Sequence, residues 1–491
     1  MLNQLHNLTE KLPYAQPRRQ APSSFNAPAR QLYCDLLRDE PGMHALQRAD
    51  AYLRQQLEAA EALESDLPCD VNDIAAWITE NTAAVGRQYR DYLGARKAGA
   101  GRRYFSCKSH ALYFLKSVAP TKLVDGAWLY GLVPYWNDAR FTTLIRIYLE
   151  ELGDGVPDKN HVLLFKRLLA SHGCEQWQNL GDSHYVQGAI QLALARHAAN
   201  FLPEVIGFNL GYEQLPLHLL ICAYELNELG IDPTYFTLHV TVDNADSGHA
   251  RKALQGLMDA MPRIGDRRGF MRRVACGYKL NMLGAGTTSV IAEFSLEREL
   301  VAIFAAKSTV GKEAHSDYCR IGGRSVNDWL SDPAQIPVFL NALVEGDWIR
   351  RGQDPRNSRF WRLVQGERAE MFGVFSAYEQ QVIYDWTAAD WEGAQQRQIS
   401  FRARQRLMET LGQPAPSSLL GARGVLRNPA QRRAAEDCND FNMELRTLEE
   451  TLAGLDSREE AMELLAGLMS PASHHSPAGL MATRIYSRML G

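Results

Sequence analysis

Helical spacing of apolar residues, sustained from Tyr104 to about Leu300, is the feature that most constrains how this chain can fold. Apolar side chains recur three and four residues apart, and short turns marked by glycine or proline separate the repeats. The clearest helical segments are 141–151, 161–171, 185–199, 213–229 and 233–261. Runs of β-branched residues are few. The pattern predicts an all-α fold built as a helical bundle, with helical extensions at both ends.

Changes in composition divide the 491 residues into four segments. Residues 1–103 are predicted to form an N-terminal arm and helical extension, and residues 104–300 the bundle. Residues 301–390 form a helical appendage whose rhythm is similar to that of a winged helix. Residues 391–491 form a C-terminal helical tail. The appendage has no basic excess, which favours a packing or homodimerising role over DNA binding.

The charge balance and the hydropathy pattern exclude several classes of protein. Lysine and arginine total 53 against 57 aspartate and glutamate, a net charge of −4, which argues against a nucleic-acid partner. No window approaches the ~18 continuous apolar residues that a membrane helix needs. The N-terminus has no apolar signal region, and the eight cysteines form no Cys-x-x-Cys pair. The expectation is therefore a cytoplasmic protein with reduced thiols and no membrane partner.

The first group of candidate metal ligands flanks a helix break. Glu151 ends one predicted helix, a Gly-x-Gly-x-Pro sequence follows, and His161 begins the next helix. The break allows two side chains ten residues apart to converge, which a straight helix would not allow. Asp158, one turn before His161, is a further candidate ligand. The alternative is an acidic turn on the surface, although carboxylates at a helix C-terminus are mildly unfavourable.

A second carboxylate lies at the start of a long apolar segment. Glu213 is expected to open the helix 213–229, with leucine and isoleucine side chains directly after it. A carboxylate that points into such an interior needs a cation, a hydrogen-bond network or a metal. The alternative is that Glu213 is exposed and favoured there by the helix dipole. Glu204 is a second candidate for the carboxylate ligand of this region.

The third group is the strongest, because four ionisable residues share one helix face. At about 100° per residue, His239, Asp243, Asp246 and His249 fall within an arc of ~120°. Imidazoles mixed with carboxylates suit iron, manganese or zinc, and a carboxylate-rich set favours iron. The alternative is a structural His–Asp network. Arg251 follows closely enough to meet an anionic substrate, and the alternative is an ordinary surface arginine. The segment 125–128 either lines the pocket or only packs.

These elements together resemble a known family, the haem-oxygenase-like diiron oxidases, also described as iron-containing redox enzymes. The matching pieces are Glu-Glu-x-Gly-x-Gly…His at 150–161, Tyr-Glu-x-x-Pro at 212–216, and Tyr-Phe-x-x-His-x-x-x-Asp with a later His-Ala at 235–250. By resemblance, the ligands of two irons would be Glu151, His161, Glu213, His239, Asp243 and His249. The family spacing puts the last histidine at position 246, which is aspartate here. We favour His249, delivered by a local bulge at Ser247-Gly248, and keep Asp246 as the alternative.

The resemblance also implies a function. It implies a haem-oxygenase-like bundle that holds two Fe(II) ions per chain and uses O2 as co-substrate, with an external electron donor where the reaction requires one. The substrate would be a small amino-acid-derived molecule of natural-product biosynthesis, and the reaction N-oxygenation or oxidative C–C cleavage. The alternatives are a metal-independent lyase on the same fold and a non-catalytic helical scaffold.

Overall fold

The computed structural model describes residues 28–242, 248–366, 369–391 and 443–490. These residues are mostly helical, which confirms the predicted all-α fold. The described strands are two residues long: β1 (Arg320–Ile321) pairs antiparallel with β2 (Arg324–Ser325). Among the described residues, no helix combines the length and apolar character that crossing a lipid bilayer requires.

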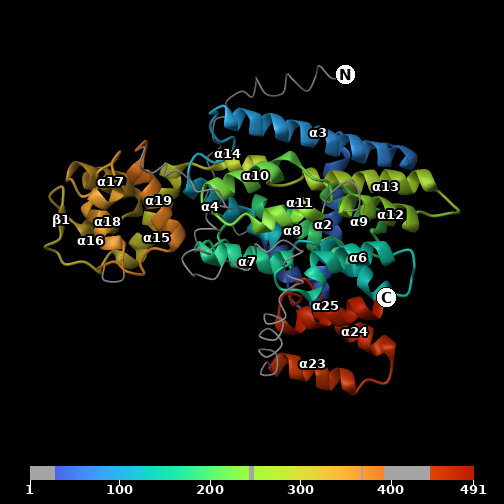
Figure 1. Cartoon of the computed structure of the whole chain (residues 1–491). Helices are drawn as coiled ribbons and strands as arrows, with labels where there is room; N and C mark the ends of the chain where they lie inside the picture. Colours follow the sequence, from blue (N-terminus) through green and yellow to red (C-terminus); the bar gives the residue numbers. More distant parts are fainter. Residues whose placement is uncertain (1–27, 243–247, 367–368, 392–442, 491) are drawn as a thin grey trace, which may run out of the picture.

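A central bundle carries helical additions on three sides, as Figure 1 shows. The bundle helices are α4 (Lys108–Ser117), α5 (Ala119–Lys122), α6 (Thr142–Glu151), α7 (His161–Ser171), α8 (Val186–His197), α9 (Leu202–Tyr212), α10 (Leu217–Glu228), α11 (Thr234–Val242), α12 (His249–Ala260), α13 (Arg267–Lys279) and α14 (Thr287–Glu293). Short 3-10 turns join them: η2 (Ala127–Tyr135), η3 (Gly153–Gly155), η4 (Asp182–Tyr185) and η5 (Leu280–Met282).

The additions come from both ends of the chain. The N-terminal helices are α1 (Pro28–Leu36), α2 (Met43–Glu61) and α3 (Val71–Lys97), and α3 runs along the top of the bundle in Figure 1. The C-terminal helices are α23 (Met443–Ala453), α24 (Arg458–Leu468) and α25 (Pro477–Leu490), drawn in red below it. The segment that we call the appendage contains α15 (Leu296–Gly311), α16 (Val326–Leu330), η6 (Pro333–Gln335), α17 (Ile336–Glu345), η7 (Pro355–Asn357), α18 (Arg359–Val364) and α19 (Ala377–Ala388).

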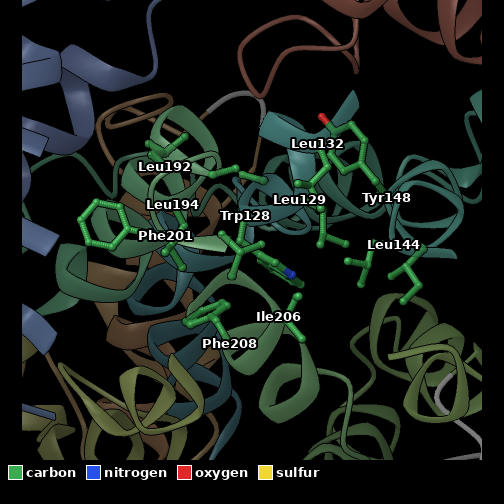
Figure 2. Close-up of a cluster of buried hydrophobic side chains, with 14 of the residues drawn as sticks. Trp128, Leu129, Leu132, Leu144, Tyr148, Leu192, Leu194, Phe201, Ile206 and Phe208 are labelled. Atoms are coloured by element: carbon green, nitrogen blue, oxygen red, sulfur yellow. The ribbon is translucent and has the colours of Figure 1, made fainter. Parts of the chain in front are cut away.

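Two hydrophobic cores hold these helices together. The first core gathers side chains of α6, α8, α9 and α12 around η2, and α1, α2, α24 and α25 add to it. Figure 2 shows its centre, where the fully buried Trp128 lies among Phe208, Ile206 and Leu194. The second core joins α4, α7, α10 and α11 to α15–α19 of the appendage. Each core therefore crosses from the bundle into a segment that lies outside residues 104–300.

The structure corrects the predicted start of the helix 213–229. Glu213 does not open that helix; it follows α9 as its C-terminal cap residue, and α10 begins only at Leu217. Pro216 explains the difference, because proline has no N–H group and pushes the residue before it out of helical geometry. Glu213 therefore stands in the α9–α10 turn.

The predicted helix 233–261 is also wrong as a single element. The structure has α11 up to Val242 and α12 from His249, with Gly248 in an extended conformation (φ −83°, ψ −171°) just before α12. An extended residue ends the regular 100° rotation between successive side chains. His239 and His249 consequently belong to two separate helices, and they do not share one helix face.

Candidate metal centre

The turn between α6 and α7 brings a carboxylate and an imidazole together. Glu151 is the last residue of α6, and His161 is the first of α7. Between them, Gly153, Asp154 and Gly155 have positive φ angles of 67°, 49° and 74°. Glycine adopts such angles without a Cβ clash, so this sequence can reverse the chain within a few residues. As a result, Oε2 of Glu151 lies 2.5 Å from Nδ1 of His161.

His239 of α11 faces the same point with an unprotonated nitrogen. Its Nδ1 lies 2.7 Å from the carbonyl oxygen of Tyr235, so Nδ1 carries the proton and donates that hydrogen bond. Burial and the neighbouring His161 lower the pKa of His239, which keeps the ring neutral. Its Nε2 lies 3.3 Å from Oδ2 of Asp125. Two lone pairs that face each other need a cation between them, and this arrangement fits a metal ion.

Asp125 is the most heavily bonded carboxylate of the centre. It accepts hydrogen bonds from the hydroxyl groups of Tyr212 (2.8 Å) and Tyr235 (2.6 Å), and the Lys122 ammonium lies 3.9 Å away. Burial by itself would raise the pKa of Asp125, but the charge of Lys122 lowers it, and the net shift is downward. Asp125 is therefore an ionised carboxylate, held in one orientation and available to a metal ion.

A second group of ligand atoms surrounds His249, the first residue of α12. Nδ1 of His249 lies 3.0 Å from Oε2 of Glu213 and 3.1 Å from Oε1 of Glu151. Nε2 of His249 lies 2.8 Å from Glu150, whose carboxylate also bonds the Lys252 ammonium at 2.5 Å. The other carboxylate oxygen of Glu213, Oε1, is buried and has no hydrogen-bond partner. A buried oxygen left without a partner is costly, and a metal ion would supply one.

Glu151 belongs to both groups and links them. Asp125, Glu151, His161 and His239 offer ligand atoms that all lie within 4.8 Å of one another, and Glu151, Glu213 and His249 form a second such set. All six side chains are buried. Three carboxylates and three imidazoles, from four helices and two turns of the bundle, make a donor set that suits iron.

Proton positions in the metal-free centre follow from its charges. Burial alone would raise the pKa of Glu151, but His161 and His249 lower it well below its usual range. Burial raises the pKa of Glu213, and the charge of Glu151 opposes its ionisation further, although His249 acts in the other direction. Burial would lower the pKa of His249, but Glu213 and the neighbouring carboxylates raise it. Imidazolium groups therefore neutralise this cluster until a metal replaces their protons.

Two other candidates lie away from this centre. Asp158 is about half exposed (53%) and pairs with Arg167 at 2.8 Å, so the structure does not place it among the ligands. It follows the η3 turn on the solvent side. Glu204, the rival of Glu213, is buried but pairs with Arg273 at 2.6 Å. Its charge is satisfied there, which leaves Glu213 as the carboxylate of this region at the centre.

Asp243 and Asp246 fall outside the described residues, so the choice between Asp246 and His249 remains a prediction. His249 lies in the second group. Arg251 is exposed on the first turn of α12, two residues after His249.

The sequence did not point to Asp125 as a ligand, nor to Glu150 as the partner of one. The usable signal for Asp125 is an aspartate followed by glycine in an otherwise apolar segment, Leu123–Leu129. Gly126 has φ 79°, and a Cβ there would lie 2.8 Å from Cβ of Glu151. The glycine therefore permits the close approach of η2 to α6 that places Asp125 beside Glu151.

Comparison with known proteins agrees with this geometry. No curated protein and no solved structure matches the chain at a significant level. Residues 112–282 match the model of a family described as iron-containing redox enzyme, and this range includes all six ligand residues of the two groups. The match places residues 112–282, most of the bundle, in the family of iron-containing redox enzymes, and the all-α fold is consistent with a haem-oxygenase-like bundle.

Proposed function

We propose that this iron-containing redox enzyme is a non-haem diiron oxidase that uses O2. The sharing of Glu151 between two buried ligand groups carries the proposal. Asp125, His161 and His239 would hold one ion, and Glu213 and His249 the other, with Glu151 between the two. When bound, two ferrous ions supply the electrons that reduce O2.

Neighbouring side chains would fix the ligands in place. The hydroxyl groups of Tyr212 and Tyr235 hold both oxygens of Asp125. The Lys252 ammonium holds Glu150, which in turn bonds His249 and sets the orientation of its ring. Such partners of metal ligands tune both affinity and geometry, and their loss typically costs ~10–100-fold in metal affinity.

Apolar side chains would keep bulk water away from the centre. The fully buried Trp128 packs against the ring of Tyr212, with centroids 4.4 Å apart. The fully buried Phe165 packs against Tyr235 at 4.9 Å. A dry environment strengthens the electrostatic effect of every charge inside it and protects a reactive oxidant from side reactions.

For the substrate, we propose a small amino-acid-derived molecule that undergoes N-oxygenation or oxidative C–C cleavage in natural-product biosynthesis. The family resemblance supports this class. Arg251, exposed two residues after the ligand His249, is our candidate for the group that meets an anionic part of the substrate.

An anaerobic Fe(II) titration tests the diiron assignment. We expect the protein to bind two equivalents tightly, and the loaded protein to consume O2. His239→Ala and His249→Ala should each bind one equivalent, because each removes a ligand of a different ion, and Glu151→Ala should weaken both sites. Circular dichroism checks that each variant stays folded.

Asp158→Asn is the matched control, since this carboxylate lies close in sequence but outside the centre; it should keep both equivalents. Saturation at one iron in the wild type would contradict a dinuclear centre. Uptake of no iron by a folded wild-type protein would favour the helical scaffold, and full turnover without metal would favour the lyase.

A further inference from the structure

The appendage contains an apolar cavity that the metal centre does not use. The cavity encloses about 170 Å³. Aromatic rings from separate elements of the appendage form its walls, among them Phe304, Phe339, Phe360 and Phe375. In Figure 1 the appendage lies at one end of the molecule, beyond the helices that carry the metal ligands.

An empty apolar chamber is unfavourable, because its lining atoms lack contact partners and water gains too few hydrogen bonds inside it. Ser308 is a buried polar residue in the lining, and its hydroxyl group already donates to the carbonyl oxygen of Ala305. An apolar cavity of roughly 150 Å³ is large enough to hold benzene. The chamber therefore fits an apolar group of intermediate size, such as part of an alkyl chain or an aromatic ring.

The chamber adjoins a wider cleft of about 1010 Å³, and the two share the lining residues Lys307, His315, Trp348 and Met371. A bound molecule can therefore extend from one into the other. At about 170 Å³ the chamber is too small for an α-helix, whose diameter is about 10–12 Å. A single chain or ring fits it, and a folded partner does not.

The cleft is more cationic than anionic along its described lining. Among the described residues that line it, Lys307 and the α18 residues Arg359 and Arg362 are cationic, and Glu370 is the carboxylate. Lys307 is already paired with Glu379 at 2.9 Å, and Arg359 stacks over Trp348 at 4.2 Å. Arg362 is exposed and has no ion-pair partner among the described residues. It is therefore the group best placed to receive an anion.

We propose that the appendage is a second binding site, for a monocarboxylate with an apolar tail. The tail fills the aromatic chamber, and the carboxylate lies in the cleft near Arg362 and Arg359, where guanidinium groups bind carboxylates in a bidentate manner. The site depends on neither iron nor the proposed oxidase reaction.

The test is isothermal titration calorimetry of the metal-free full chain with hexanoate, octanoate and decanoate. We expect one molecule per chain, and affinity that rises about fourfold per added methylene until the chamber is full. Octan-1-ol, which has the same tail without the charge, should bind at least about tenfold more weakly than octanoate. Equal binding of the alcohol, or affinity independent of chain length, would overturn the proposal, as would no binding at all.

Two pairs of variants locate the site. Val374→Trp places a large ring where the chamber meets the cleft and should abolish octanoate binding, whereas Val338→Trp, on an exposed part of α17 away from the cavity, should leave it unchanged. Arg362→Gln should weaken octanoate about tenfold with no effect on octan-1-ol, and Arg356→Gln, exposed but outside the lining, should change neither. Unchanged octanoate binding by folded Val374→Trp would place the ligand elsewhere.

Discussion

Among single residues, Gly126 controls how closely two ligand-bearing elements approach each other. Its φ of 79° is left-handed, and an added Cβ would overlap Cβ of Glu151 at 2.8 Å. We predict that Gly126→Ala lowers the free energy of unfolding by about 2–4 kcal/mol, through backbone strain together with this overlap. It should also weaken iron binding, because Asp125 and Glu151 must move apart. Urea unfolding and an anaerobic Fe(II) titration measure the two effects.

Gly99→Ala is the matched control for this prediction. Gly99 also has a positive φ, 96°, but no atom lies within 4 Å of the position that its Cβ would take. The control should cost only the strain, about 1–2 kcal/mol, and should leave iron affinity unchanged. Equal losses of stability and of iron affinity in both variants would show that contact with Glu151 is unimportant.

His249 gives the centre a defined response to pH. Neighbouring carboxylates raise its pKa, so it is protonated at neutral pH in the metal-free protein. A metal binds only neutral imidazole, so binding must release this proton. We predict that iron affinity rises with pH, by about tenfold per pH unit for each proton released.

Anaerobic calorimetry in buffers of different ionisation enthalpy counts the released protons. His249→Gln should release fewer protons than the wild type while the rest of the centre still binds one ion. Affinity that falls as pH rises from 6 to 8 would contradict this protonation state.

At the scale of elements, the sequence predicted helices where local signals are strong, and missed details that depend on tertiary contacts. The helix at 161–171 has the predicted bounds, because Asn160 caps its start. The start of α10 was placed at Glu213 instead of Leu217, because the apolar residues begin before the helix does, although Pro216 signals the later start. Asp125 was not selected as a ligand, because only its burial beside Glu151 distinguishes it from an aspartate that merely packs.

The cap of α7 offers a prediction at this scale. The side chain of Asn160 accepts a hydrogen bond from the backbone N–H of Leu163 (2.9 Å), and it donates to the carbonyl oxygen of Leu152 and to His474. Asn160→Ala should lower the free energy of unfolding by about 1–3 kcal/mol, because buried partners lose their bonds. It should also weaken iron binding, since His161 follows directly.

Asp70→Ala removes a comparable cap from α3 at an exposed position, where Asp70 accepts from the N–H of Asn72 at 3.0 Å. That variant should lose about 1 kcal/mol and no iron affinity. Iron binding that stays at the wild-type level in Asn160→Ala would mean that other contacts position His161.

At the scale of the whole molecule, the metal centre lies between the two hydrophobic cores. Glu151 and His249 belong to helices of the first core, α6 and α12, and Glu213 directly follows α9 of the same core. His161 and His239 belong to α7 and α11 of the second. Metal ions bound here would therefore connect a core that includes the C-terminal helices to one that includes the appendage.

This arrangement predicts that metal binding makes unfolding more cooperative. Without metal, hydrogen-bonded pairs of carboxylates and imidazoles join the two cores at the centre. We therefore expect calorimetry of the metal-free protein to show a broad or divided thermal transition. Fe(II) at 100 times its dissociation constant should stabilise the native state by about 2.7 kcal/mol per site. It should also merge the transition into one, because the ligands Glu151, His161 and His239 of one ion come from helices of both cores. His239→Ala should keep the ion that Glu213 and His249 hold, and with it part of the stabilisation. Its thermal transition should remain divided, because the retained ligands Glu151, Glu213 and His249 all belong to the first core. A single sharp transition in the metal-free protein would show that apolar contacts alone couple the two cores.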